Sequence, residues 1–190
     1  MTDCHTPAHH SGLARLADWL AEYAPATGLL GYDSSDAIFE NAVLPANVLP
    51  ELLGGPLIGD WADLGAGSGA LGLALAILCP ASNLTLVDRR KRASDFSELA
   101  AKRLRIANVQ TRTLDLRPGE DGPRFAGTCL RAVTETHAAL AIAAGMSRRW
   151  ICAWHAPSLI AYDCPPEGFL IASRSGVLAP NLIATLYARR

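Results

Sequence analysis

The amino-acid sequence predicts an α/β fold, in which a mostly parallel sheet of seven strands carries helices and its last strand is antiparallel. Two observations support this fold class. Short apolar runs alternate with helical patterns along most of the chain, and only a turn separates the last two apolar runs. A length of 190 residues suits one such domain and is too short for two. Half of the residues are hydrophobic and 18% are charged, which is typical of a compact folded protein.

Two helical segments are expected before the sheet begins. In the first, apolar residues recur at three- and four-residue steps from Leu13, with Ser11 as the N-cap and Pro25 as the stop. The second begins at a serine cap, is interrupted by Pro45 and ends at Gly54. We expect both segments to lie beside the ligand-binding edge of the sheet. The predicted organisation is a disordered tail at 1–10 and a single domain at 11–190, made of a helical cap at 11–55 and an α/β core at 56–190.

The core itself is predicted from alternating strands and helices. Each predicted strand is a short apolar or β-branched run bounded by turn residues, and each predicted helix has an apolar face. The predicted strands cover 58–64, 84–88, 109–114, 128–133, 150–154, 169–173 and 182–188, and the predicted helices cover 70–79, a segment ending near 107, and 134–146.

The segment Asp63-Leu64-Gly65-Ala66-Gly67-Ser68-Gly69 joins the first strand of the core to its first helix. Glycine tolerates the positive φ and the close ligand approach that such a turn requires, and the helix N-terminus behind it offers unpaired N–H groups. Asp88 ends the next strand roughly 20 residues beyond the turn, where α/β folds place a carboxylate that accepts hydrogen bonds from a ribose. The segment therefore predicts a nucleotide-like cofactor at the carboxyl ends of the strands.

Two cofactor classes and one structural alternative are compatible with three glycines at alternate positions. Gly65, Gly67 and Ala70 satisfy the dinucleotide fingerprint Gly-x-Gly-x-x-Gly/Ala. The segment from Asp63 to Gly69 also consists of an acidic residue, one spacer and Gly-x-Gly-x-Gly. In this order it is similar to the pattern of S-adenosylmethionine-dependent enzymes, which it matches literally. The structural alternative is a turn that binds no ligand. We favour S-adenosyl-L-methionine because acidic residues stand on both sides of the turn.

A basic run, Arg89-Arg90-Lys91-Arg92, follows directly and precedes a helix. Cations near a helix N-terminus oppose the helix dipole, so this placement suggests a function. We expect the run to face the phosphates of a nucleic acid, and the alternative is a solvated surface. The formal net charge of −1 argues against a generally basic nucleic-acid-binding surface but leaves room for such a local patch.

Together, the segment from Asp63 to Asp88, the basic run and Leu130-Arg131-Ala132-Val133 resemble the bacterial small-subunit ribosomal RNA guanine-N7 methyltransferases, the RsmG or GidB family. In that family an apolar helix ending in proline follows the turn, as at Pro80, and a Ser-Arg-Ala-Val segment comes later. The resemblance covers the chain from about Leu16 onward. It implies a Rossmann-like class I methyltransferase fold and S-adenosyl-L-methionine as methyl donor. We also expect a monomer, and a cytoplasmic location because residues 1–12 have no signal pattern of a basic and then an apolar stretch. It also implies transfer to a guanine N7 in small-subunit ribosomal RNA, with that RNA or the small ribosomal subunit as partner.

The chain departs from the family where the nucleic acid would bind. Glu40-Asn41-Ala42-Val43-Leu44-Pro45 replaces an Arg-His…Asp-Ser element, Asp115-Leu116-Arg117 replaces Arg-Ala-Glu, and His155-Ala156 replaces Lys-Gly. Two alternative hypotheses therefore stand beside the first. One is a small-molecule methyltransferase of the same fold, and the other is a cofactor-binding protein with degraded catalysis.

The resemblance and the strand ends together define a candidate site. Asp63 is expected near the methionine amino group, Asp88 at the ribose hydroxyls, and Asp115 with Leu116 near the adenine amino group. Arg131, which is too costly to bury unpaired, is expected to meet a carboxylate, a phosphate or the cofactor's carboxyl group, and it is the candidate catalytic residue. The candidate cofactor contacts are Asp63, Gly65, Ala66, Gly67, Gly69, Leu71, Asp88, Arg89, Asp115, Leu116 and Arg131. The candidate substrate contacts are Arg90, Arg92 and His155, with Tyr32 and Trp154 as candidates to stack on a base.

The acceptor chemistry fits a site without a general base. Guanine N7 carries a nucleophilic lone pair and needs no deprotonation, whereas an alcohol acceptor would need a base such as His137 or His155.

No membrane or metal partner is expected. The longest apolar run, 70–79, is too short to cross a bilayer, and the five cysteines lack Cys-x-x-Cys spacing and suit reduced thiols in the core. The pair His5 and His9 falls in the predicted tail.

Overall fold

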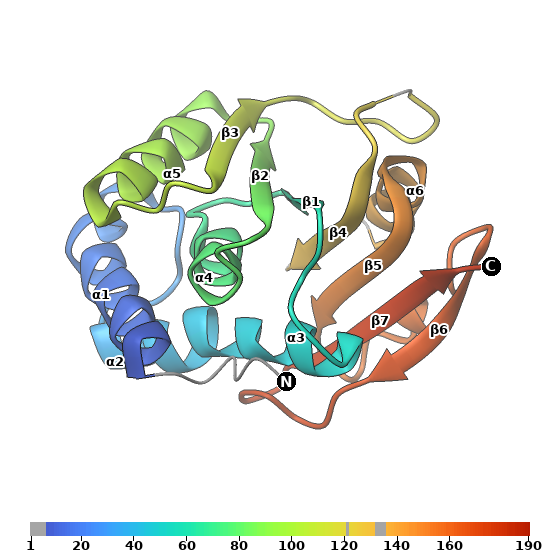
Figure 1. Ribbon diagram of the computed structural model, residues 1–190, viewed down its shortest axis with the longest axis horizontal. Helices are drawn as coiled ribbons and strands as arrows, with labels where there is room; N and C mark the ends of the chain where they lie inside the picture. Colours follow the sequence, from blue (N-terminus) through green and yellow to red (C-terminus); the bar gives the residue numbers. More distant parts are fainter. Residues whose placement is uncertain (1–6, 121, 132–135) are drawn as a thin grey trace.

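A computed structural model describes residues 7–120, 122–131 and 136–190. It contains a seven-stranded sheet in the order β3-β2-β1-β4-β5-β7-β6 (Figure 1). The strands β1 to β5 are parallel, and β7 pairs antiparallel with both β5 and β6. This confirms the predicted mostly parallel sheet with an antiparallel last strand. The strands are β1 (Asp60–Leu64), β2 (Asn83–Asp88), β3 (Val109–Thr113), β4 (Phe125–Arg131), β5 (Ser147–His155), β6 (Phe169–Arg174) and β7 (Ile183–Arg189).

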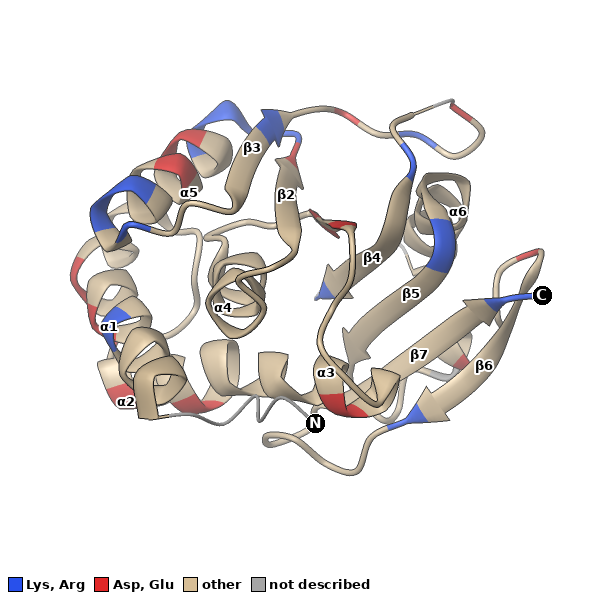
Figure 2. Cartoon of the chain, in the orientation of Figure 1, with Lys and Arg blue, Asp and Glu red and all other residues tan. Residues whose placement is uncertain are grey.

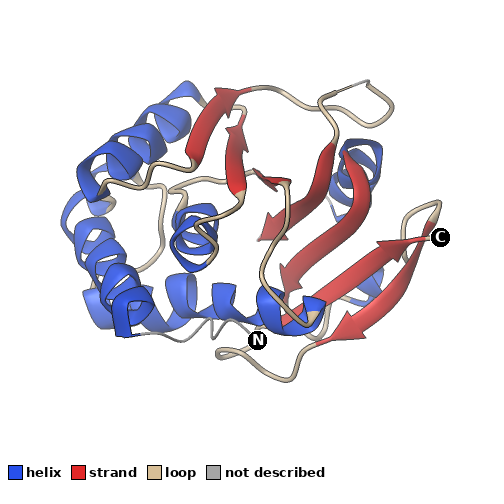
Figure 3. Cartoon of the chain, viewed as in Figure 1, coloured by secondary structure: helices blue, strands red, loops and turns tan. Residues whose placement is uncertain are grey.

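Helices pack against both faces of the sheet. Figure 3 colours the helices blue and the strands red. Successive residues of β1 point to opposite faces. Trp61 packs in one hydrophobic cluster with residues of α1, α4 and α5, whereas Ala62 and Leu64 pack in a second cluster with residues of α6. The helical segments are α1 (Pro7–Tyr23), η1 (Pro25–Thr27), α2 (Ser35–Ile38), η2 (Phe39–Val43), η3 (Leu44–Asn47), α3 (Val48–Leu53), α4 (Ala70–Leu78), α5 (Lys91–Leu104), α6 (Thr136–Met146) and η4 (Ile160–Asp163).

The first helix begins earlier than the sequence predicts. α1 starts at Pro7, so residues 7–10, which we predicted to belong to a disordered tail, form its first turns, and Ser11 is not its cap. Proline suits this position because the first N–H of a helix has no intrahelical partner to lose. His10 also packs edge-on against Phe39, with ring centroids 5.3 Å apart. Residues 1–6, including His5, lie outside the described residues.

The second helical segment is divided as predicted around Pro45, but its form is irregular. α2 begins behind Ser34, whose hydroxyl accepts the N–H of Ala37 at 3.3 Å. The chain then passes through the π-helical turn η2 and the 3-10 turn η3 before α3 begins. In the π-helical register the N–H of Leu44 donates to the carbonyl of Phe39, five residues before it, and Pro45, which has no N–H, cannot continue this pattern.

Three strands begin two or three residues away from their predicted starts, and one of them, β4, begins at Phe125 and not at Thr128. β1 begins at Asp60 because Ile58 is exposed, and β5 begins at Ser147, three residues before the predicted start. The side chain of Ser147 is buried and shares a hydrogen bond of 2.8 Å with the hydroxyl of Thr128 in β4. The predicted strand end at Val133 and helix start at Thr134 lie outside the described residues.

Three of the described cysteines support the expectation of reduced thiols in the core. Cys79, Cys129 and Cys152 are buried, and Cys164 is exposed. Burial raises the pKa of Cys129 and Cys152 well above the usual value. Cys129 and Cys152 are paired in register on β4 and β5. These thiols therefore contribute to packing. Among the described helices, none combines the length and the apolar content that crossing a membrane would require.

Candidate functional site

The glycine turn after β1 is fastened to the neighbouring strand. The N–H groups of Gly65 and Ala66 both donate to the carbonyl of Val87 in β2, at 2.8 and 3.0 Å. Gly69 is the N-cap of α4 with a φ of 78°, and a Cβ at this position would lie 2.7 Å from the hydroxyl oxygen of Ser97. Backbone and packing both require glycine there. At Gly65, by contrast, a Cβ would meet no atom within 4 Å, so a ligand can approach the turn from this side.

Asp63 lies beneath the turn and is almost fully buried. Its Oδ2 accepts the N–H of Gly72, in the first turn of α4, at 3.0 Å. Burial raises the pKa of Asp63 to about 7, although the Gly72 hydrogen bond and the charge of Arg131 both act to lower it. The carboxyl group therefore stands between its charged and neutral forms near neutral pH, at the positive end of a helix.

Gly72 is a site residue that the sequence prediction does not include. A Cβ there would lie 3.0 Å from Oδ2 of Asp63 and 2.9 Å from Cγ of Leu86, so only glycine allows the carboxylate to approach the helix backbone. The sequence carries a signal for this contact. A glycine inside an apolar helix costs about 1 kcal/mol relative to alanine, and such a position often marks a close approach.

Asp88 ends β2 on the other side of the turn, and its two oxygens accept four hydrogen bonds. The N–H of Gly67 donates to Oδ2 at 2.9 Å and the backbone N–H of Arg90 donates to Oδ1 at 2.9 Å. The Arg90 side chain adds Nε to Oδ1 at 3.1 Å and Nη2 to Oδ2 at 3.2 Å. Burial alone would raise the pKa of Asp88, but the hydrogen bonds from Arg90 and Gly67 outweigh it and hold the pKa below its usual value. Asp88 is therefore ionised.

Arg131, at the end of β4, connects the sheet to the helical cap. Its guanidinium donates to the carbonyl of Ala42 at 2.7 Å and to the carbonyl of Asn41, both of which lie in the π-helical turn η2. Burial lowers the pKa of Arg131, and the interactions with Tyr32 and Asp63 act against that shift. The partners differ from the expected carboxylate or phosphate, because two backbone carbonyls receive the N–H groups.

Two cavities meet at the glycine turn, and Gly65, Arg90 and Arg131 line both. The first, of about 400 Å³, is called the β2 pocket, and the second, of about 500 Å³, is called the glycine-turn pocket. The β2 pocket is lined by Leu64, Gly65, Val87, Asp88, Arg89, Arg90, Leu114, Asp115, Leu116, Leu130, Arg131, Ala138, Ala139 and Ile142. The glycine-turn pocket is lined by Leu29, Leu30, Gly31, Tyr32, Ala42, Asp63, Gly65, Ala66, Gly67, Ser68, Ala70, Leu71, Arg90 and Arg131.

The structure thus brings most of the predicted cofactor contacts to two adjoining cavities. Gly69 lines neither, because it supports the turn from the side of α5, through its contact with Ser97. Arg92 is exposed on α5 and also lines neither cavity. Leu29, Leu30 and Gly31 of the loop before α2, and the α6 face at Ala138 and Ile142, were not predicted, because sequence periodicity does not reveal which distant segments close a cavity.

A third cavity, the β5 pocket, adjoins the glycine-turn pocket and shares Tyr32 and Arg131 with it. Its volume is about 320 Å³. Trp154 contributes a fully buried ring whose Nε1 donates to the carbonyl of Pro45 at 3.0 Å, so in this structure the ring is a packing element and not a free stacking surface. The β5 pocket is lined by Tyr32, Asn41, Arg131, Trp154, His155, Ala156, Leu159, Tyr162, Ala179, Pro180, Asn181 and Leu182.

His155 lies in this wall with both ring nitrogens engaged inside the fold. Nδ1 donates to the carbonyl of Ala156 at 2.9 Å, and Nε2 accepts from the hydroxyl of Thr185 at 2.8 Å. The ring stacks on Tyr162 with centroids 4.1 Å apart, and burial lowers its pKa. This arrangement differs from the predicted substrate contact, because neither nitrogen is left for a substrate.

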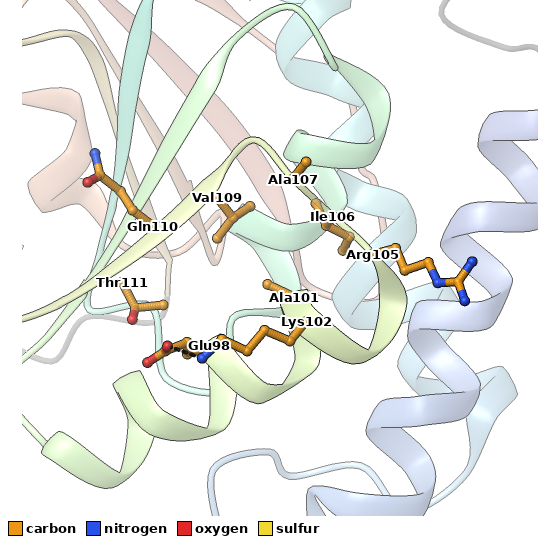
Figure 4. A pocket seen from close by; sticks show the side chains of 9 residues that line it. All are labelled: Glu98, Ala101, Lys102, Arg105, Ile106, Ala107, Val109, Gln110 and Thr111. Atoms are coloured by element: carbon orange, nitrogen blue, oxygen red, sulfur yellow. Dashed lines mark hydrogen bonds and ion pairs between the residues drawn. The ribbon is translucent and has the colours of Figure 1, made fainter.

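A further cavity, of about 590 Å³, lies elsewhere, between the end of α5 and the edge strand β3 (Figure 4). Its wall is made by residues such as Lys102, Arg105 and Gln110, and none of the predicted site residues lines it. It is therefore separate from the candidate site. Within the described ranges, no group of three or more His, Cys, Asp or Glu side chains is arranged to hold a metal ion.

Comparison with known proteins identifies the family. The family model of GidB, rRNA small subunit methyltransferase G, matches residues 9–149. Two similar curated proteins, both named ribosomal RNA small subunit methyltransferase G, come from Rhizorhabdus wittichii and Thermobifida fusca. The first is 30% identical over 103 residues, which cover 53% of this chain and 46% of that protein. The second is 34% identical over 96 residues, which cover 50% of this chain and 40% of that protein. The chain thus spans less than half the length of these curated relatives.

Solved structures show the same fold. The magnesium protoporphyrin IX methyltransferase of Synechocystis, solved with bound S-adenosylmethionine, superposes with a TM-score of 0.62 at 17% identity, covering 94% of this chain and 97% of that one. The ribosomal protein L11 methylase of Lactobacillus delbrueckii gives a TM-score of 0.60 at 16% identity, covering 76% and 77%. The fold is that of class I methyltransferases. Because the family model covers well over half of the residues, the chain belongs to the GidB family, rRNA small subunit methyltransferase G.

Proposed function

We propose that the chain is an S-adenosyl-L-methionine-dependent methyltransferase that modifies a guanine N7 in small-subunit ribosomal RNA. One observation carries the proposal: Asp63 and Asp88 flank a glycine turn between two adjoining cavities, in a chain of the GidB family. The RNA substrate and the guanine N7 acceptor come from the family resemblance, and the cofactor comes from the turn and its carboxylates.

The residues around the two cavities suit an elongated cofactor with a nucleoside half and an amino-acid half. In the β2 pocket, Asp88 supplies ionised acceptors for ribose hydroxyls, and Leu116 and Ile142 supply apolar walls for an adenine. In the glycine-turn pocket, Asp63 suits an amino group and Arg131 suits a carboxyl group. S-adenosyl-L-methionine, when bound, supplies a methyl group that its sulfonium charge has already activated. The chain's own task is then to hold and orient.

The acceptor base is proposed to enter the β5 pocket. This cavity is small for a ligand site, near the lower limit of about 300 Å³, which suits one base and not a whole nucleotide. Tyr32 is 38% exposed at its mouth and can stack on a base displaced from its helix. None of the described residues that line it is Asp, Glu or Lys, and His155 has no free nitrogen. Such a wall supports an acceptor with its own lone pair, such as guanine N7, and does not support an alcohol that needs a base.

The test is transfer of a tritiated methyl group from S-adenosyl-L-methionine to naked small ribosomal subunits and to total RNA, with mass mapping of the product. We expect label on one guanine of the small-subunit RNA. Asp88→Ala serves as the matched control and should incorporate less label at a limiting cofactor concentration, because loss of charge-assisted hydrogen bonds raises the cofactor Kd by about tenfold or more. Tight cofactor binding by the native chain with no label on RNA would contradict the RNA assignment and favour a small-molecule acceptor.

A further inference from the structure

We propose that the Arg90 side chain occupies the positions on Asp88 that the cofactor's ribose requires. The ribose displaces it, and the freed guanidinium then binds a phosphate of the RNA substrate. This inference rests on the proposed function, because it uses both the cofactor and the RNA assigned there. It adds a coupling between the two ligands that passes through one side chain.

The hydrogen bonds at Asp88 show why the ribose and Arg90 compete. Each carboxylate oxygen accepts one backbone N–H, from Gly67 or from Arg90, and one N–H of the Arg90 guanidinium. A carboxylate offers about four acceptor positions, so all are in use. When the guanidinium leaves, each oxygen keeps its backbone donor and regains one free position. A vicinal diol has two O–H donors, and the two vacated positions suit it.

The location of Arg90 also indicates that it is the partner that moves. Its side chain is 44% exposed, whereas the Asp88 side chain is only 6% exposed and held by backbone N–H groups. Arg90 lines both the β2 pocket and the glycine-turn pocket, so a cofactor that extends through both must pass it. Rotation of an exposed arginine into solvent disturbs no packing in the core. Asp88 keeps its place while Arg90 leaves.

The surroundings of the freed guanidinium favour an anion. Arg90 is the N-cap of α5, where an unpaired cation opposes the helix dipole. Lys91 is already paired with Asp95 at 2.7 Å, but Arg89 and Arg92 are exposed beside it. Figure 2 shows Lys and Arg gathered at this end of α5 and at the neighbouring end of β3. A phosphate accepts the planar guanidinium in a bidentate manner and relieves this excess of positive charge.

The exchange is tested by calorimetric titration of S-adenosylhomocysteine, which has the same ribose but no sulfonium charge. We expect Arg90→Ala to bind it roughly three- to tenfold more tightly than the native chain, because one partly exposed ion pair no longer competes. Lys91→Ala removes the same charge one residue away and should leave the Kd unchanged. In an Asp88→Ala background, Arg90→Ala should have no effect. The proposed exchange would be overturned if Arg90→Ala bound S-adenosylhomocysteine no more tightly than the native chain. It would also be overturned if Arg90→Ala tightened binding in the Asp88→Ala background.

The phosphate contact is tested by measuring the affinity for a small-subunit ribosomal RNA transcript at several salt concentrations, with and without S-adenosylhomocysteine. In the native chain the slope of log K against log salt should steepen by about 0.7 to 0.9 when the ligand is added, which corresponds to one more phosphate contact. In Arg90→Ala the two slopes should coincide. Equal slopes in the native chain overturn the phosphate contact. If the native chain binds no RNA, both the phosphate contact and the proposed RNA substrate are overturned. The calorimetric titration then still decides whether the ribose displaces Arg90 from Asp88.

Discussion

Asp63 and Asp88 are chemically identical side chains, yet their surroundings give them opposite titration behaviour. Asp63 is buried and accepts a single backbone N–H, from Gly72, so burial prevails and its pKa rises to about 7. Asp88 accepts four hydrogen bonds, two of them from a guanidinium, so its pKa falls below the usual value. One carboxylate thus stays charged throughout the neutral range while the other gains or loses a proton within it.

The raised pKa of Asp63 predicts a specific dependence of stability on pH. The unfolded chain releases this proton near pH 4 and the folded chain near pH 7, so between these values the folded state binds more protons. The free energy of unfolding should therefore fall as pH rises through this window, with a contribution from Asp63 of up to about 1.4 kcal/mol per pH unit. Below pH 4 this stabilising contribution is fully present, and above pH 7 it is lost.

Urea unfolding of the native chain and of Asp63→Asn between pH 4 and 8 measures this contribution. Asparagine is nearly isosteric and does not titrate, so the difference between the two curves isolates Asp63 from the other titrating groups. As pH rises to about 7, the free energy of unfolding of the native chain should fall relative to that of Asp63→Asn by up to about 1.4 kcal/mol per pH unit. Beyond about pH 7 the two curves should run parallel. Parallel curves across the whole range would show that Asp63 titrates normally.

At the scale of elements, the helical cap and the sheet are joined by one side chain, that of Arg131. Its guanidinium donates to the carbonyl of Asn41, which lies 90 positions earlier in the chain. Two carbonyls of the irregular run of π and 3-10 turns from Phe39 to Asn47 thus accept hydrogen bonds from a side chain at the end of β4. The same guanidinium lines all three site cavities, so the conformation of the cap and the shape of the site are linked.

This link predicts that Arg131 contributes to stability. Arg131→Met removes the side-chain donor of two carbonyls and should reduce the free energy of unfolding, measured in urea, by about 1 to 3 kcal/mol. Arg148→Met, at an exposed position of β5, is the control and should change stability by less than about 0.5 kcal/mol. An equally small effect of Arg131→Met would contradict the link.

The same elements show what sequence patterns reveal and what they do not. The glycine turn and the strand ends at Asp63 and Asp88 were predictable, because strand, turn and helix signals are local. The contact between Arg131 and Asn41 was not predictable, because no local pattern relates segments so far apart. The pairing of Arg90 with Asp88 spans only two residues but was also missed, because a run of four cations suggests a surface that faces outward.

At the scale of the whole molecule, the cap and the core share one hydrophobic cluster. Leu16 and Leu20 of α1 are fully buried in the same cluster as Leu73 of α4 and Trp61 of β1. Neither part has a separate core on this face of the sheet. We therefore expect the cap and the core, predicted as one domain, to unfold together.

Leu16→Ala tests this expectation. Truncation of a fully buried leucine should lower the free energy of unfolding by about 2 to 5 kcal/mol, and it should do so for the sheet as well as for α1. Tryptophan fluorescence and far-ultraviolet circular dichroism should give coincident transitions in both proteins. Leu99→Ala, at a leucine 46% exposed on α5, is the matched control with a small effect. Two separate transitions in Leu16→Ala would show that the cap is an independent unit.

The strand order has a consequence for how the chain folds as it is synthesised. β6 is made before β7, yet β6 stands at the edge of the sheet and β7 fills the place between it and β5. While the polypeptide emerges from the ribosome, β6 therefore has no neighbour to pair with until residues 183–189 follow it. The walls of the glycine turn are complete earlier in translation. The β5 pocket, whose wall includes Ala179 to Leu182, is the last part of the site to form.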